Sequence, residues 1–422
     1  MAFTKVKGAM IDGNIDASQL SGALPALDAA NLTNVDAEKV LKGNGAPTSN
    51  INPAGGVGTL YVNTATGEIL ICTNSTTDAN VWMNAGVGTQ NVIPPGPMVA
   101  TGGNEVITSA THKYHIFTSS GQLEVATATN GAQWENSLEV LVVAGGGSGG
   151  KGEFGAGGGG GAGGYQVFTA QPDLLVGTYD VIVGAGGVGV NTNAHGISGN
   201  NSSFKHHGGV YSYPDMESTG GGGGQGSSSL PTGNPVYDRD GGSGGAMGQG
   251  IPGQGNRGGT KGDNDYGSGP GGGGASQYGE YSYRYRTNAG GKGGNGKNDC
   301  ASWCSDIASA GGQTYGYDTG YFAGGGGGGS NFGNSSAMAS GGLGGGGHGN
   351  TAKVSTVFAL TEADHVNWHG PGLVNSGGGG GACQVDLHGN DENWTIPHYG
   401  HDPVKVTGES GGSGIVIIRY PL

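Results

Sequence analysis

The chain has 422 residues, of which 100 are glycine, whereas soluble proteins ordinarily carry about 7 % glycine. Only 11 % of the residues are charged and the formal net charge is −14, which excludes a charge-rich disordered tail and a coiled coil and argues against a nucleic-acid partner. No apolar run is long enough to span a membrane, and residues 1–10 lack the apolar core of a secretory signal. We therefore expect neither membrane insertion nor export by the general secretory route.

The first segment, residues 1–48, carries a few leucines and valines that are interrupted by Pro25 and by many Asn, Asp and Gly residues. This is too little apolar surface for a domain that folds alone. Wrapping with copies of itself would bury that surface. We therefore predict a stalk or docking segment that assembles as a homotrimer.

Residues 49–97 have the pattern of a small β module. Leu60–Asn63 and Glu68–Cys72 alternate apolar and polar side chains and flank a four-residue turn, which predicts a β-hairpin. Trp82 is expected to cover its apolar face. Three prolines between residues 94 and 97 then form a stiff spacer.

The remainder, residues 98–422, begins and ends with strand-like sequence. The closing run Ile415–Tyr420 is apolar and β-branched, which is typical of a strand buried on both faces. Its expected partners lie far upstream, so the first and last strands should share a sheet of a β-sandwich. These partners are residues 112–117, 138–143, 165–169 and 179–183.

Glycine is concentrated between these strands, with 16 glycines in residues 1–144 and 84 in residues 145–422. The runs have no Gly-X-Y period, and each interior glycine would cost an α-helix roughly 1 kcal/mol, so collagen and α-helix are both excluded. A flexible linker and a packed bundle of polyglycine II helices remain. Pure glycine runs recur between long segments of different character, which favours the bundle, with one helix in each run of the part spanning residues 145–414. The intervening segments would be loops: residues 200–213, 231–240, 278–286, 298–321, 350–369 and 384–405.

The predicted fold is therefore mainly β with non-regular structure and little α-helix: a β-sandwich carrying polyglycine II helices, with small N-terminal β modules. Thirteen of the 17 tyrosines follow residue 200, mostly in the predicted loops. Rigid amphipathic rings on loops favour a binding face, although capping of exposed glycine surface is the alternative for any single ring. The candidate receptor-binding residues are Tyr211, Tyr213, Tyr278, Tyr281, Tyr283, Arg284, Tyr285, Arg286, Trp303, Trp368 and Trp394.

The chemistry-bearing motifs predict no catalytic residue and no cofactor. Residues 184–189 match a dinucleotide fingerprint, but turn residues follow them where that site needs a helix. His365 and His369 have metalloprotease spacing, yet Val366 replaces the required glutamate. A structural metal and plain solvated histidines both remain open for the group His365, His369, His398 and His401. A Cys300–Cys304 bridge and two reduced thiols also both remain open.

Two sets of motifs resemble bacteriophage proteins. Gly58–Glu68 and Leu24–Val35 look like small modules of tail fibres. The second set resembles the glycine-rich domain of phage receptor-binding proteins and, more loosely, the glycine-rich ectodomain of the anaplastic lymphoma kinase group. This set is Leu138–Gly150, Gly160–Tyr165, Gly177–Gly187 and Gly411–Tyr420.

The resemblance implies a polyglycine-helix bundle whose loops contact a bacterial surface. It leads to the hypothesis of a non-catalytic tail-fibre adhesin in the virion, made in the host cytoplasm, attached to other tail proteins through its N-terminal region. Its receptor would be a saccharide or an outer-membrane protein. One alternative is a polysaccharide-depolymerising tailspike, which needs a pair of carboxylates on a rigid scaffold. A structural virion decoration protein is the other.

Overall fold

The computed structural model divides the chain into two compact units, residues 1–95 and 96–422, and each is considered by itself. The structure describes residues 40–84, 91–92, 97–128, 137–152, 156–171, 174–192, 194–208, 216–226, 239–261, 268–282, 290–330, 339–349, 370–384, 395–398, 401–405 and 407–422.

The first unit is one five-stranded sheet in the order β1-β2-β3-β4-β5. Its strands are β1 (Val40–Gly43), β2 (Leu60–Asn63), β3 (Ile69–Asn74), β4 (Val81–Asn84) and β5 (Asn91–Val92). Only β1 and β2 pair in parallel; the other described neighbours are antiparallel. Residues 40–43, predicted as part of the N-terminal segment, thus belong to this sheet.

The predicted hairpin is confirmed, because β2 and β3 pair antiparallel with Leu60 opposite Ile71. Trp82 is fully buried on β4, and its ring meets Tyr61 edge-on at a centroid distance of 5.6 Å. It packs there with Leu70 and covers the hairpin as predicted.

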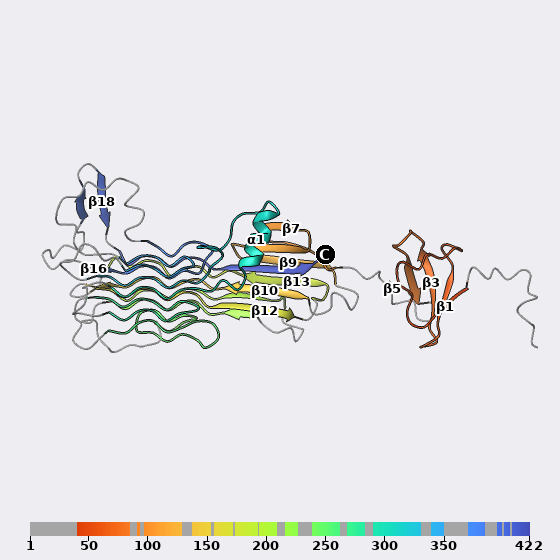
Figure 1. Ribbon diagram of the computed structural model, residues 1–422, viewed down its shortest axis with the longest axis horizontal. Helices are drawn as coiled ribbons and strands as arrows, with labels where there is room; N and C mark the ends of the chain where they lie inside the picture. Colours follow the sequence, from red (N-terminus) through yellow and green to blue (C-terminus); the bar gives the residue numbers. More distant parts are fainter. Residues whose placement is uncertain are drawn as a thin grey trace, which may run out of the picture. The chain divides into compact units, whose positions relative to one another are not determined.

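The second unit is built on two facing five-stranded sheets, in the orders β12-β10-β19-β8-β7 and β15-β14-β13-β9-β6 (Figure 1). The strands of the first sheet are β7 (Glu105–Thr108), β8 (His112–Phe117), β10 (Leu138–Val143), β12 (Tyr165–Gln171) and β19 (Ile415–Pro421). Those of the second are β6 (Val99–Thr101), β9 (Gly121–Thr127), β13 (Gly177–Ile182), β14 (Ser202–His206) and β15 (Met216–Ser218).

The closing strand β19 lies between β10 and β8, so the prediction that the first and last strands share a sheet is confirmed. Residues 165–169 lie in the same sheet, in β12, but pair with β10 and not with β19 as predicted. The prediction that residues 179–183 also pair with β19 is wrong, since β13 pairs with β9 and β14 in the facing sheet. The burial patterns explain the difference. β19 is buried on both faces, whereas β13 buries only alternate side chains such as Tyr179 and Val181.

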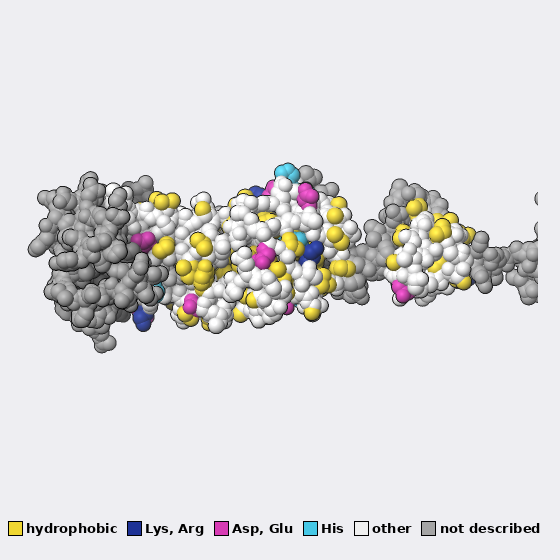
Figure 2. All heavy atoms as spheres, turned by 90° about the horizontal axis from the view of Figure 1, so that it is seen from above, with side chains coloured by type: hydrophobic (Ala, Val, Ile, Leu, Met, Phe, Trp, Pro, Cys, Tyr) yellow, Lys and Arg dark blue, Asp and Glu magenta, His cyan; other side chains and the backbone are white. Residues whose placement is uncertain are grey.

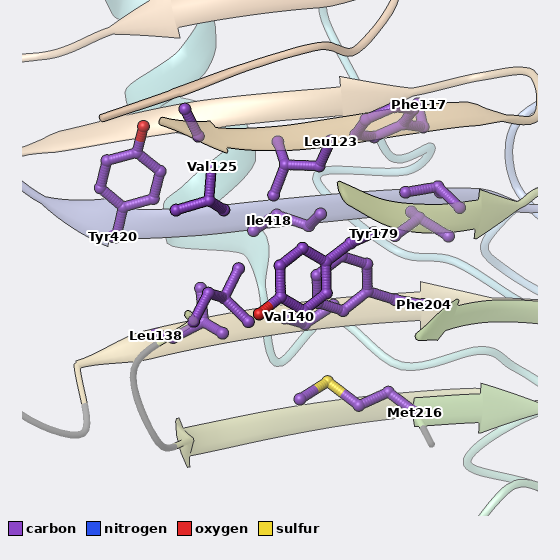
Figure 3. Close-up of a cluster of buried hydrophobic side chains, with 14 of the residues drawn as sticks. Phe117, Leu123, Val125, Leu138, Val140, Tyr179, Phe204, Met216, Ile418 and Tyr420 are labelled. Atoms are coloured by element: carbon purple, nitrogen blue, oxygen red, sulfur yellow. The ribbon is translucent and has the colours of Figure 1, made fainter. Parts of the chain in front are cut away.

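Alternating side chains of the two sheets meet in a continuous apolar core (Figure 3). Val140 and Ile418 project from one sheet, while Leu123, Tyr179 and Phe204 project from the other. The Tyr179 and Phe204 rings stack at a centroid distance of 5.4 Å. Burial of this apolar surface is the main force that holds the sheets together.

A single described α-helix, α1 (Ala301–Ser309), covers the outer face of the first sheet. Its apolar residues recur at the i, i+3, i+4, i+7 spacing of one helix face and pack on the strands. They are Cys300, at the N-cap of the helix, and Trp303, Cys304 and Ile307 within it. The prediction of a loop over residues 298–321 is therefore wrong in its first half, where this helical spacing outweighs the surrounding glycine.

The two cysteines of this helix face are free thiols that lie in the apolar cluster. Burial raises the pKa of Cys300 to about 12 and that of Cys304 to about 11. Of the two alternatives, the structure therefore has the reduced thiols, and it keeps them protonated and shielded from solvent.

The glycine-rich segments form polyglycine II helices whose backbone hydrogen bonds go mostly to other segments. Along residues 145–150, successive N–H groups donate to three different neighbours and return to the first after three residues, as a helix with about three residues per turn requires. The donor–acceptor pairs are Gly145–Asn200 and Ser148–Ile197, then Gly146–Gly412 and Gly149–Glu409, then Gly147–Gly161 and Gly150–Gly158, with N···O distances of 2.8–3.0 Å.

The carbonyl groups of residues 145–150 accept from three further segments, so this helix has six neighbours. Those that donate to it include residues 187, 221–224 and 380–383. Residues 157–164 are surrounded in the same way, again with a repeat of three residues. Six hydrogen-bonded neighbours around one helix make a hexagonal array, and the flexible-linker interpretation is therefore wrong for these segments.

Close approach of backbones explains the choice of glycine. A Cβ atom at Gly146, Gly147 or Gly160 would lie less than 3.0 Å from a carbonyl oxygen of the adjacent helix. Real Cβ atoms essentially never come so near, so any larger residue would force the array apart.

The array grows directly out of the sandwich (Figure 1). Strand β10 continues as residues 145–150, and residues 407–414 lead straight into β19. Helices also form where pure glycine runs are lacking: residues 194–200 contain only Gly196 and Gly199. The prediction of one helix for each glycine run is thus too narrow, because a helix at the surface needs glycine only on its buried side.

Candidate functional site

The bundle has an outer end, away from the sandwich, where helices that leave the sheets turn back. At this end β11 (Lys151–Gly152) pairs in parallel with β16 (Cys383–Gln384), and Lys151 bridges to Ala194. The N–H of Gly226 donates to Nδ1 of His195 at 2.8 Å. These contacts fix the helix ends that precede two of the predicted loops, residues 231–240 and 384–405.

Many predicted site residues fall outside the described residues. Tyr283, Arg284, Tyr285 and Arg286 follow the outward-running residues 277–282, whereas Trp368 and Trp394 precede described residues of the same bundle end. Tyr211 and Tyr213 differ in position: the described residues around them, His206 and Met216, lie at the end of their sheet away from the bundle. The candidates therefore do not all belong to one face.

Tyr278 and Tyr281 are described, and they lie on a helix rather than in the predicted loop. The N–H groups of Gly279, Glu280 and Ser282 donate to three carbonyls of neighbouring segments, which holds residues 277–282 in the array. The two tyrosines are three residues apart, so they project from the same side of a three-residue-per-turn helix, about 9 Å from each other along its axis. Both are exposed, Tyr278 to 62 % and Tyr281 to 41 %.

The residue that connects these two rings is not among the predicted candidates. Arg257, on the adjacent residues 254–261, donates from Nη2 to the hydroxyl of Tyr281 at 2.7 Å. Its guanidinium carbon lies 5.3 Å from the centroid of the Tyr278 ring and 5.9 Å from that of Tyr281. We call these three residues the Arg-Tyr cluster. Only the array brings residue 257 beside residues 278 and 281, so no local sequence signal reveals it.

Trp303 is a correction to the predicted binding surface. It is only 3 % exposed and lies on α1 against the first sheet. The Arg419 guanidinium stacks 4.3 Å from its ring centroid, which covers it further. Trp303 is therefore a core residue, because the apolar face of the helix needs a large side chain there.

The candidate metal ligands give no described site. His365 and His369 lie outside the described residues, and His398 and His401 are described only as backbone, opposite each other in β17 (Thr395–His398) and β18 (His401–Lys405). Within the described ranges, no group of three or more His, Cys, Asp or Glu side chains is placed to hold a metal ion. No helix in the described part of the chain is long and apolar enough to cross a membrane.

The described surface of the bundle is poor in charge. On the face that Figure 2 shows, charged side chains are sparse and lie scattered among backbone, polar and apolar residues. A charged side chain held in a fixed position, such as Arg257, is therefore a distinctive feature of this surface.

The comparison with protein families matches the model of a glycine-rich domain over residues 118–421. The chain belongs to this family. A search of curated proteins finds no match. The glycine-rich domain match starts after β8, although β8 pairs along its length with β19 inside the domain. The folded unit is therefore larger than the family match and includes the strands β6, β7 and β8.

Proposed function

We propose that this glycine-rich protein is a bacteriophage tail-fibre adhesin that binds a host surface receptor without chemical modification of it. The observation that carries the proposal is the hydrogen-bonded array itself, which holds helix ends in fixed positions at one end of the bundle. A platform of this kind can present several segments of unrelated sequence together. Those segments hold many of the chain's aromatic residues, which suit recognition.

The way in which the platform is held together supports the same function. Backbone-to-backbone bonding makes the bundle independent of the sequences that leave its end, so these sequences can vary without loss of the fold. An adhesin that must follow a changing receptor needs this separation. The receptor would be a saccharide or an outer-membrane protein.

The remaining parts of the proposal concern assembly. The N-terminal residues 1–48 would join copies of the chain as a homotrimer and dock on other tail proteins. The protein would then be part of the virion after synthesis in the host cytoplasm. Sedimentation of the full chain tests the trimer directly.

The test of the function is binding of the fluorescently labelled full-length protein to a panel of bacterial strains. We expect saturable binding to a subset of strains, with loss of binding when residues 283–289 or 350–369 are replaced by Gly-Ser linkers. Binding to no strain would contradict the proposal and favour a virion decoration protein. Release of oligosaccharides from purified capsule or lipopolysaccharide would instead identify a depolymerising tailspike.

A further inference from the structure

The Arg-Tyr cluster carries a positive charge that is held but not neutralised within the described structure. The guanidinium of Arg257 has one described hydrogen bond, to a neutral phenol, and no ion pair with a described carboxylate. The acid nearest in sequence to the tyrosines is Glu280. Its carboxylate accepts a hydrogen bond from the backbone N–H of Lys292, on another helix. In a chain with a net charge of −14, such a cation is open to an anionic partner.

The cluster is also rigid, which a surface arginine seldom is. The N–H of Gly279, between the two tyrosines, donates to the carbonyl of Arg257 itself at 3.2 Å. A Cβ atom at Gly279 would lie 2.7 Å from the backbone nitrogen of Gly259, two residues after Arg257, so the two backbones are packed in direct contact. Contacts to two rings and one hydroxyl then orient the guanidinium plane, and less entropy is lost when it binds.

The remaining chemistry of the cluster is that of a sugar-binding surface. The exposed ring of Tyr278 offers a flat apolar face to the C–H groups of a pyranose. The guanidinium N–H groups of Arg257 that have no partner among the described residues match the two oxygens of a carboxylate. We propose that Arg257, Tyr278 and Tyr281 form a subsite on the side wall of the bundle for an acidic saccharide whose charge is a carboxylate. This inference rests on the proposed adhesin function and names the ligand class for one of its surfaces.

The experiment measures binding of the full-length protein to three carboxylated polymers, polygalacturonate, hyaluronan and polysialic acid, by isothermal titration calorimetry. Neutral dextran and dextran sulfate are the reference polymers. We expect at least one carboxylated polymer to bind, with affinity lowered about tenfold or more in Arg257→Gln and about threefold to tenfold in Tyr278→Ala. Equal binding of neutral dextran, or binding of none of the carboxylated polymers, would overturn the proposal.

The matched control for charge is Lys205→Gln, which removes an exposed cation from β14 on the sandwich. The Lys205→Gln variant should bind the carboxylated polymer with unchanged affinity. An equal loss of affinity in this variant would show general charge attraction instead of a subsite. Tighter binding of dextran sulfate than of the carboxylated polymers, unaltered by Tyr278→Ala, would show the same. Coincident thermal unfolding of all variants confirms that the fold is intact.

The two proposals fail separately. Normal binding of the protein to cells, without binding to the polymers, would refute the subsite alone. Polymers that bind while no strain does would refute the adhesin function alone.

Discussion

At the scale of single residues, the position of a Cβ atom decides which glycines are needed. Gly160 and Gly370 are both in the glycine-rich part, but a methyl group at Gly160 would lie less than 3.0 Å from the carbonyl oxygen of Gly147, whereas at Gly370 its nearest neighbour is 3.9 Å away. The sequence alone cannot distinguish the two glycines, since both lie in glycine-rich sequence.

We therefore expect Gly160→Ala to lower the free energy of unfolding by about 3 kcal/mol or more, because the surrounding backbones cannot yield. Gly370→Ala, the matched control, should change it by less than about 0.5 kcal/mol. Urea unfolding of both variants measures the difference. Equal stability of the two proteins would contradict the close packing of the array.

A second residue-scale prediction concerns pH and His115. Its imidazole is fully buried, with Nδ1 2.7 Å from the carbonyl of Gly102 and Nε2 3.0 Å from the Tyr420 hydroxyl. Burial lowers the pKa of His115, and nearby Lys113 lowers it further, while the Gly102 carbonyl opposes the shift. The unfolded chain therefore binds a proton at a higher pH than the folded chain does.

Stability should consequently fall as the pH drops below about 6.5, the ordinary histidine value, toward the lower pKa of the folded state. His115→Gln should be less stable at pH 7.5 but should lose less of its stability between pH 7.5 and 5.5. Chemical unfolding at a series of pH values checks this. Parallel curves for the two proteins would show that His115 does not titrate as described.

At the scale of elements, the sequence predicts best where a pattern is local or repeated. The hairpin of β2 and β3 and the strands β10 and β19 follow from apolar alternation and from apolar runs. Helix α1 has an equally clear spacing, but its glycine-rich surroundings led to a loop prediction. The Arg-Tyr cluster has no such signal, because its residues meet only through the side-by-side packing of two helices.

The contact of α1 with the first sheet supports an element-scale prediction. Ile307 is fully buried in this contact, so Ile307→Ala should cost about 2–5 kcal/mol of unfolding free energy through lost burial and a cavity. Ser305→Ala, on the exposed side of the same helix, serves as the control and should be neutral or slightly stabilising. Equal effects would mean that α1 does not pack on the sheet as observed.

In the second unit as a whole, the array is held by its own hydrogen bonds and not by the segments that leave it. The backbone N–H of Gly370 donates to the carbonyl of His348 at 3.3 Å. The described residues on either side of residues 350–369 therefore lie next to each other. A short Gly-Ser linker can therefore replace this segment. We expect the thermal midpoint to stay within about 4 °C of the parent, since shortening a loop changes the closure entropy little. Unfolding at a much lower temperature would show that the segment supports the array.

A backbone consisting largely of glycine is ordered here by hydrogen bonds to six neighbours. Hydrogen–deuterium exchange of the full-length protein tests it most directly, read for residues 145–150 and 157–164 beside the strands β10 and β19. The account predicts that these glycine amides exchange as slowly as the strand amides do, because each donates to a carbonyl inside the array. Exchange of the glycine amides at the rate of an unstructured chain, with the strands still protected, would contradict it.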